Sequence, residues 1–260
     1  MIKKIKSVIK NNFIRPKVNS INTVDKYLSG ESFDVGLIIK LEGLTKNKGE
    51  FLLDLVKDKK IIHVGCVDHL DLIKEKIKEG TWLHSKLDKI TNRCLGVDIN
   101  TEGIEFMKKD LGYDDLECVD IADTKSSKIL DDKFDYMLLA EILEHVYNPL
   151  DFLTKIRENY KNNIEKIVIT VPNGFCYSRF KDAKNGYQNI NSDHKTEFSY
   201  YTLAKILYMA GFDIENIMIL EPSVKIWHKF VNFIFNRKIV YNPSLGLGAS
   251  LIAVAKFNDK

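Results

Sequence analysis

Three residues that follow predicted strands are of types that can bind a nucleoside. Gly65 ends a short apolar strand, and Asp98 and Asp120 end the next two strands. A glycine lets the backbone turn sharply and lets a ligand approach it closely. A carboxylate after the second strand of an open α/β sheet is well placed to accept both hydroxyls of a ribose. Together these three residues predict an adenosine-type ligand at one edge of a parallel sheet.

The elements that must position these residues alternate between strand and helix from residue 61 to residue 220. Residues 61–64 form a short apolar run bounded by turn signals, which is typical of a strand buried on both faces. Further strands are predicted at 93–97, 116–119, 134–139, 166–171, 212–220 and 249–257, with helices between them. This alternation predicts a doubly wound α/β sheet with right-handed crossovers and helices on both faces. The carboxyl ends of its parallel strands are where ligands bind in such sheets.

Three segments lie outside this alternation. Residues 1–30 are rich in Lys and Asn and are predicted to be a basic extension, so that residues 31–260 form one domain. Residues 174–198 are polar and aromatic, and they are predicted to form a loop or lid over the site. Residues 222–247 carry aromatic side chains at helical spacing, which favours a hydrophobic cover, a homodimer contact or a peripheral membrane contact.

Composition argues against several classes of protein. The chain has 260 residues, of which 45% are hydrophobic and 29% charged, as in a single α/β domain. No apolar run reaches the roughly 18–20 residues of a membrane span, and the N-terminus lacks the apolar core of a signal peptide. The four cysteines, Cys66, Cys94, Cys118 and Cys176, lie far apart and show no metal-ligand spacing. We therefore predict buried free thiols, a cytoplasmic protein and no metal site.

Three further motifs follow one another in the second half of the chain. Residues 134–149 read FDYMLLAEILEHVYNP, Val-Pro-Asn follows at 171–173, and His194 precedes a Phe-Ser pair at 198–199. With the glycine and the two carboxylates, this order resembles the class I S-adenosylmethionine-dependent methyltransferases, and in particular those acting on small molecules and glycans. The resemblance covers about residues 46–221. It implies a Rossmann-like seven-stranded sheet in the order 3-2-1-4-5-7-6, with strand seven antiparallel.

The same resemblance implies which positions bind S-adenosylmethionine and its product S-adenosylhomocysteine. Carried over by position, the residues around the methionine part are Gly65, Cys66 and Val67. Asp98 would hold the ribose with Ile99 against the adenine, and Asp120 would meet the adenine amino group with Ile121 beside it. The floor near the sulfonium would be formed by Ala140 and Glu141.

The sequence departs from the family pattern in the first loop. His63 stands where an acidic residue is usual, and Val67 and His69 stand where two more glycines are usual. Extra helical material also lengthens the gap between Gly65 and the first carboxylate. His63 and His84 remain candidates for the cofactor site, because His84 could reach back toward the cofactor.

Methyl transfer to a hydroxyl is helped by a general base, and histidine suits this role because its pKa lies near neutrality. His145 follows the fourth strand and His194 lies in the predicted lid, so both are candidate bases. Glu141 and Glu144 are alternatives, although Glu144 is expected to face solvent on the turn before Pro149.

The leading hypothesis is an S-adenosylmethionine-dependent methyltransferase that O-methylates a small-molecule or glycan acceptor. A non-catalytic methyltransferase-like binding or scaffold protein is the alternative, and the degenerate glycine loop favours it. A nicotinamide-dependent oxidoreductase would need Gly-X-Gly-X-X-Gly, whereas residues 65–70 read GCVDHL. A nucleic-acid substrate is disfavoured, because strand four is not followed by the Asn/Asp-Pro-Pro-aromatic motif of amino-methylating enzymes. The sequence identifies neither the acceptor nor the oligomeric state.

Overall fold

The computed structural model describes residues 18–19, 24–32, 37–68, 70–221 and 248–257. The chain divides into two compact units, residues 1–40 and 41–260. In the first unit, β1 (Val18–Asn19) pairs in parallel with β2 (Ile38–Ile39), and α2 (Asp25–Ser29) lies between them in the sequence. The sequence analysis did not predict these three short elements, because none carries a sustained apolar period.

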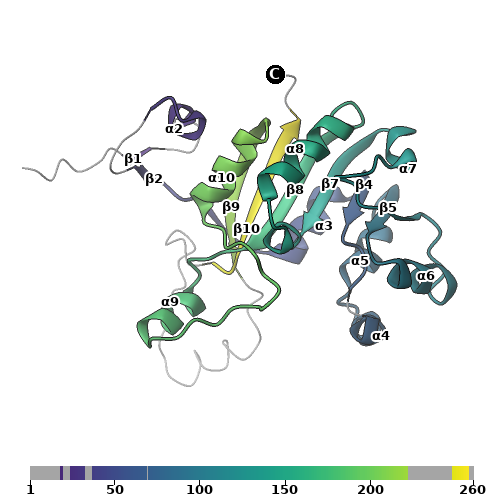
Figure 1. Cartoon of the computed structure of the whole chain (residues 1–260). Helices are drawn as coiled ribbons and strands as arrows, with labels where there is room; N and C mark the ends of the chain where they lie inside the picture. The colour runs from purple at the N-terminus through teal and green to yellow at the C-terminus, as the bar shows by residue number, and fades with distance from the viewer. Residues whose placement is uncertain (1–17, 20–23, 33–36, 69, 222–247, 258–260) are drawn as a thin grey trace, which may run out of the picture. The chain divides into compact units, whose positions relative to one another are not determined.

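The second unit is built on one eight-stranded sheet with the order β3-β9-β10-β8-β7-β4-β5-β6 (Figure 1). The strands are β3 (Gly43–Asn47), β4 (Lys60–Val64), β5 (Arg93–Asp98), β6 (Leu116–Cys118), β7 (Phe134–Ala140), β8 (Ile164–Pro172), β9 (Phe212–Glu221) and β10 (Ser250–Phe257). β10 runs antiparallel to both of its neighbours, and the other pairs in this sheet are parallel. Counted from β4, the seven predicted strands lie in the predicted order, which confirms the fold.

β3 is an eighth strand that the prediction did not include. It pairs in parallel with β9 at the edge of the sheet. Its five residues read GLTKN and contain one large apolar residue, so the segment has no strand period of its own. The tertiary structure, and not a local preference, therefore makes it a strand.

The central strands are buried on both faces, as their continuous apolar runs predict. Ile61 and Ile62 of β4 point to opposite faces of the sheet, and both are fully buried. On one face, α3 (Lys48–Val56) and α5 (Leu83–Asp88) pack against the strands through a shared apolar cluster. Figure 1 shows α8 (Pro149–Tyr160) and α10 (Tyr200–Met209) in front of the sheet and α3 behind it.

The ends of the long helices follow their capping residues. Asn148 accepts a hydrogen bond from the backbone of α8, and a proline occupies the first turn, so this helix begins where the sequence predicts. Ser199 and Thr202 form a capping box at the start of α10. The remaining helices are α4 (Leu70–Lys78), α6 (Thr101–Lys109), α7 (Ser127–Leu130), the 3₁₀ helix η2 (Leu143–His145) and α9 (Tyr177–Lys184).

Two predicted features of the chain need comment. The segment 174–198 contains the helix α9, which was not predicted because none of its residues is buried and it shows no apolar stripe. The aromatic insertion at 222–247 lies outside the described residues. Among the residues that the structure describes, no helix has the length and apolar character needed to cross a bilayer.

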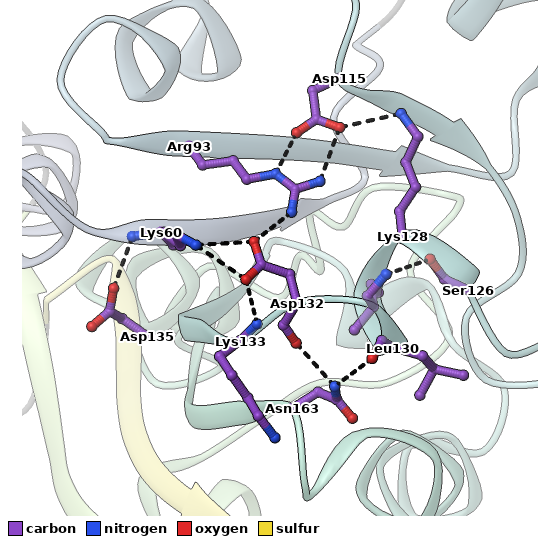
Figure 2. A network of polar contacts seen from close by, with 11 residues as sticks. Lys60, Arg93, Asp115, Ser126, Lys128, Leu130, Asp132, Lys133, Asp135 and Asn163 are labelled. Carbon is purple, nitrogen blue, oxygen red and sulfur yellow. Dashed lines mark hydrogen bonds and ion pairs between the residues drawn. The ribbon is translucent and has the colours of Figure 1, made fainter.

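A network of charged residues links the amino ends of the central strands, at the edge opposite the predicted site (Figure 2). Arg93, the first residue of β5, donates to Asp115 through Nε at 2.7 Å and Nη2 at 3.3 Å. Its third guanidinium nitrogen donates to Asp132 at 2.8 Å, and Lys60 of β4 binds the same carboxylate at 3.0 Å. The backbone N–H of Lys133, together with Lys60 and Arg93, lowers the pKa of Asp132 to about 2. We interpret the network as structural, because it lies at the amino ends of the strands, whereas ligands bind at the carboxyl ends in sheets of this kind.

Candidate functional site

A cavity of about 1100 Å³ opens at the carboxyl ends of the central parallel strands. Of the residues proposed for the cofactor, its lining includes His63, Gly65, Cys66, Val67, Asp98, Ile99, Asp120, Ile121, Ala140 and Glu141. Of the candidate bases, His145 lines the cavity and His194 does not. The topology explains this convergence, because β4 lies between β5 and β7 and the ends of these parallel strands meet at one edge.

Gly65 makes the sharp turn that leads out of β4. Its φ angle is +71°, a left-handed conformation that side chains disfavour, and its N–H donates to the Val97 carbonyl at 2.8 Å. A Cβ atom here would lie 2.2 Å from Cδ1 of Ile142, a residue that follows β7. The left-handed φ therefore favours glycine at this position, and any side chain here would also displace the end of Ile142.

The loop after Gly65 is tied to β5 and packs against α6. The Val67 N–H donates to Oδ2 of Asp98 at 2.9 Å. A Cβ atom on Gly103 of α6 would lie 2.2 Å from Cγ1 of Val67. The bulk of Val67, at a position where a glycine is usual in the resembling family, is thus accommodated by a glycine on the facing helix. The sequence analysis did not single out Gly103, since nothing local connects it with Val67.

Asp98 is a partly buried carboxylate with two backbone donors. Besides Val67, the N–H of Asn100 donates to its Oδ1 at 2.9 Å. Burial raises the pKa of Asp98, although these backbone hydrogen bonds oppose the shift. An ionised carboxylate has about four acceptor sites, so two backbone donors leave capacity for the hydroxyls of a ligand.

Apolar and acidic groups alternate along the adjoining wall of the cavity. Ile99 is 72% exposed, a large value for an apolar side chain, and it offers a flat contact to a ring. Asp120 is exposed and accepts the N–H of Ala122 through Oδ1 at 3.0 Å. Ile121 beside it is buried. This wall can hold a ring through apolar contact and accept a hydrogen bond at its edge.

His63 and His84 form a buried pair beneath the first loop. Their Nδ1 atoms lie 3.1 Å apart, and the rings stack with centroids at 5.4 Å. One of these two nitrogens must donate and the other accept, so the two rings are not both protonated. Burial lowers the pKa of His63 well below its ordinary value and lowers that of His84 to about 4.

The expectation that His84 could reach the cofactor needs correction. His84 lies on α5 and is 1% exposed, and it is not among the residues that line the cavity. Its ring contacts His63, Trp82 and Tyr113. It therefore supports His63 from the helical layer and does not face a ligand.

Glu141 directly follows β7 at the floor of the cavity. It has a φ of +59°, which is rare and costly for a residue with a side chain. Lys48 Nζ lies 2.9 Å from its Oε1, and the Thr170 hydroxyl donates to the same oxygen at 3.0 Å. Lys48 is the first residue of α3 and is far from Glu141 in the sequence, so the sequence analysis could not pair the two residues.

Glu144 and His145 lie on the short helix η2 beside this floor. His145 Nδ1 is 2.8 Å from Oδ2 of Asp193, which also lines the cavity, and the His145 and His194 rings meet edge to face at 4.9 Å. His194 thus belongs to the same cluster, although it does not line the cavity. The sequence analysis did not identify Asp193 as the partner of His145. The only signal for this role in the sequence is that Asp193 precedes the candidate base His194.

The expectation that Glu144 faces solvent is wrong. Its side chain is 1% exposed, because the backbone N–H groups of Lys195 and Thr196 donate to the Glu144 carbonyl and hold their segment over η2. Burial and the neighbouring Glu141 raise the pKa of Glu144 to about 7. The turn alone would expose this residue, and only the returning segment buries it.

The four cysteines are free thiols, as predicted. Cys66, Cys94 and Cys176 are buried, but Cys118 at the end of β6 is exposed, against the prediction. Burial raises the pKa of the Cys66 thiol, so this residue meets the cavity as a neutral group.

A family model described as "Methyltransferase domain" matches residues 42–217. No curated protein shows significant sequence similarity to the chain.

Several solved structures resemble the chain. The small RNA methyltransferase HEN1 is 16% identical with a TM-score of 0.53, over 82% of this chain and 25% of HEN1. The chain therefore spans about a quarter of the length of that protein. A proposed methyltransferase from Bacillus halodurans is 11% identical with a TM-score of 0.50, over 81% of this chain and 99% of that one. A SAM-dependent methyltransferase from Archaeoglobus fulgidus is 17% identical with a TM-score of 0.44, over 80% and 94% of the two chains. At these identities the first two matches, with TM-scores of 0.53 and 0.50, show the fold alone.

Proposed function

The chain belongs to the methyltransferase-domain family, within the class I S-adenosylmethionine-dependent enzymes, and from this premise we propose that it O-methylates a small-molecule or glycan hydroxyl. S-adenosylmethionine is the cofactor, and it supplies an activated methyl group on a sulfonium. One observation carries the proposal: a single cavity joins the positions expected for the cofactor to a polar end formed by Glu141, His145 and Asp193.

The residues around the cavity fit an adenosyl cofactor. Its volume of about 1100 Å³ is sufficient for a ligand of this size and an acceptor. Asp98 would hold the ribose through the acceptor sites that its backbone donors leave free, and Ile99 would cover the adenine. Asp120 would accept from the adenine amino group. The backbone of the loop after Gly65 would contact the methionine part of the cofactor. Hydrogen bonds to β5 already hold this loop in its turn.

The polar end of the cavity would orient the acceptor and remove its proton. Lys48 and Thr170 fix the Glu141 carboxylate, so this group is held in one orientation. His145 directs Nδ1 to Asp193, which leaves Nε2 for an acceptor hydroxyl. His194 contacts the His145 ring and would complete this set. Holding the acceptor close to the methyl donor and excluding water are the main contributions a protein makes to such a transfer.

The chemistry of this end favours a neutral, hydroxyl-rich acceptor. Glu141 and Asp193 present carboxylate oxygens, which accept hydrogen bonds from hydroxyls, and Lys48 and Lys195 balance their charge. Tyr147 is 86% exposed and lines the same cavity, so its ring offers a flat surface to a sugar.

Calorimetry and a transfer assay together test the proposal. Titration of the full chain with S-adenosylmethionine and S-adenosylhomocysteine should show saturable binding, and Asp98→Asn should weaken it. Transfer of a labelled methyl group should then be measured against a panel of sugars, oligosaccharides and small hydroxylated molecules, with RNA for comparison.

The outcomes of these two measurements separate the alternatives. Transfer to a hydroxylated acceptor that falls in His145→Gln supports the proposal. Cofactor binding with transfer to RNA alone would overturn the acceptor class. Failure to bind either ligand at millimolar concentration would overturn the enzyme assignment and favour a scaffold protein.

A further inference from the structure

Three side chains of metal-binding type converge beside the floor of the cavity. Glu144 and His145 come from η2, and His194 comes from the segment that folds back over it. One ligand atom of each residue lies within 4.8 Å of the ligand atoms of the other two. Ligand atoms around a tetrahedral metal ion, with bonds of about 2.1 Å, lie about 3.4 Å apart. Side-chain shifts of less than about 1 Å would therefore close the set around an ion.

Glu144 is the member of this cluster that most needs a cation. Its side chain is 1% exposed, and neither carboxylate oxygen has a hydrogen-bond partner among the residues that the structure describes. A buried carboxylate without a partner costs several kcal/mol, and natural structures satisfy such groups with a hydrogen bond, an opposite charge or a metal. A metal ion at the cluster would satisfy it directly.

His145 is oriented in the way that metal-binding histidines commonly are. Its Nδ1 lies 2.8 Å from Oδ2 of Asp193, so Nδ1–H donates to a carboxylate. This outer hydrogen bond fixes the tautomer, leaves Nε2 as the ligand atom and makes that nitrogen more basic. The His194 ring meets the His145 ring edge to face, which brings a second imidazole to the same point.

The backbone also holds the cluster together. The N–H of Lys195 donates to the Glu144 carbonyl at 2.7 Å, and the N–H of Thr196 donates to the same oxygen at 3.2 Å. The residue next to His194 is therefore bound to the residue next to His145. The side chains meet because their backbones are joined, and not through chance rotamers on a surface.

We propose that Glu144, His145 and His194 bind one divalent transition-metal ion, with Asp193 as the outer partner of His145. Two imidazoles and one carboxylate are the ligand set of many non-haem iron sites and of His₂Glu zinc sites. The imidazoles favour manganese, iron, cobalt or zinc over magnesium or calcium, which prefer oxygen ligands. The sequence analysis predicted no metal site, because it considered only the spacing of the cysteines. The proposed site contains no cysteine and therefore differs from that prediction.

The ion would lie at the acceptor end of the cavity, because His145 and Asp193 both line it. A divalent ion there would polarise an acceptor hydroxyl and lower its pKa, so that the acceptor loses its proton more readily. In that case the histidines act as ligands, and the hydroxyl proton would pass to the Glu141 carboxylate, which lines the same cavity. This role rests on the proposed methyl transfer, whereas the binding of the ion does not.

Metal binding should be tested on the full chain without cofactor or acceptor, so that a failure of the proposed function leaves this test intact. The protein is stripped with EDTA and titrated with Mn²⁺, Zn²⁺ and Co²⁺, with Mg²⁺ for comparison. We expect one saturable site per chain, a d–d absorption band with Co²⁺, and a rise in Tm with bound metal.

Variants identify the ligands. Glu144→Gln and His194→Gln should lower the affinity at least tenfold and abolish the rise in Tm, and Asp193→Asn should lower the affinity about tenfold. Glu158→Gln, an exposed residue of α8, is the matched control and should bind as the wild type does. Urea midpoints in EDTA show whether each variant folds.

The proposal is overturned if the wild type shows no saturable binding of any of the three transition metals. It is equally overturned if folded Glu144→Gln and His194→Gln bind as tightly as the control.

Discussion

Acid should destabilise the fold through the buried His63–His84 pair. Both rings are neutral in the folded protein, because burial lowers the pKa of His63 well below 6.5 and that of His84 to about 4. In the unfolded chain each histidine takes up a proton near pH 6.5. The unfolded state therefore binds more protons below that pH, and the free energy of unfolding falls as the pH decreases.

The magnitude follows from the two pKa values of His84. With a pKa of 6.5 in the unfolded chain and about 4 in the folded one, the loss between pH 8 and pH 5 is about 2 kcal/mol. His63 adds to the loss in the same direction. Of the groups facing the pair, Cys94 has a raised pKa and stays neutral over this range. It therefore does not offset the effect.

Glu144 acts in the opposite direction and must be separated from the pair. Its pKa is raised to about 7, so the folded state holds a proton that the unfolded state has lost, and acid stabilises the fold through this group. The wild-type pH profile alone therefore does not isolate the histidines. A variant that keeps Glu144 but lacks both histidines isolates their contribution. In the difference between its pH profile and that of the wild type, the contribution of Glu144 cancels.

Urea unfolding in EDTA, followed by circular dichroism from pH 8 to pH 5, provides the assay. The double variant H63Q/H84Q should lose less stability than the wild type over this range, by at least about 2 kcal/mol. His145→Gln, which leaves the buried pair intact, should follow the wild type. Parallel profiles for the wild type and the double variant would refute the assignment of two neutral, buried histidines.

Three substitutions test the rest of the structure. Gly65→Ala should cost about 1–2 kcal/mol of stability, because alanine disfavours a φ of +71° and its Cβ would press on Ile142, and calorimetry should show weaker binding of S-adenosylmethionine. Normal cofactor affinity in this variant would contradict the role given to the turn. Asp98→Asn should raise the Kd for S-adenosylmethionine about 10- to 100-fold, the value of a hydrogen bond to a charged group, and an unchanged Kd would remove the ribose assignment. Arg93→Met should lower the urea midpoint by an amount equivalent to about 1 kcal/mol and leave cofactor affinity unchanged, because the Figure 2 network lies at the opposite edge of the sheet. A loss of affinity there would mean that the two edges are coupled.

Much of the cofactor side of the site was predictable from local patterns. Residues 61–64 are apolar apart from His63, and the glycine after them predicts the end of β4. The alternation of strands and helices then predicts that Gly65, Asp98 and Asp120 share one edge of the sheet, and all three line the cavity. A parallel sheet with right-handed crossovers leaves few other arrangements.

The acceptor side was much less predictable. The contact of Lys48 with Glu141 and the link from Asp193 to His145 each join elements that lie far apart in the sequence, as does the packing of Val67 on Gly103 on the cofactor side. None of these contacts has a periodicity that a local pattern could show. β3 and α9 were missed for a similar reason, since neither carries an apolar stripe.

The sequence by itself determined the succession of strands and helices along the chain, the glycine turn and the two carboxylates that follow the neighbouring strands, because short-range periodicity controls where each strand ends. Only the tertiary structure decided that Glu144 is buried with no hydrogen-bond partner for its carboxylate among the described residues, that His84 lies behind His63, and that His194 joins the cluster on η2. Burial of a residue on a turn depends on which distant segment packs over it. Here the backbone of residues 193–196 returns to η2 and converts an apparently solvent-facing turn into a cluster of possible ligands.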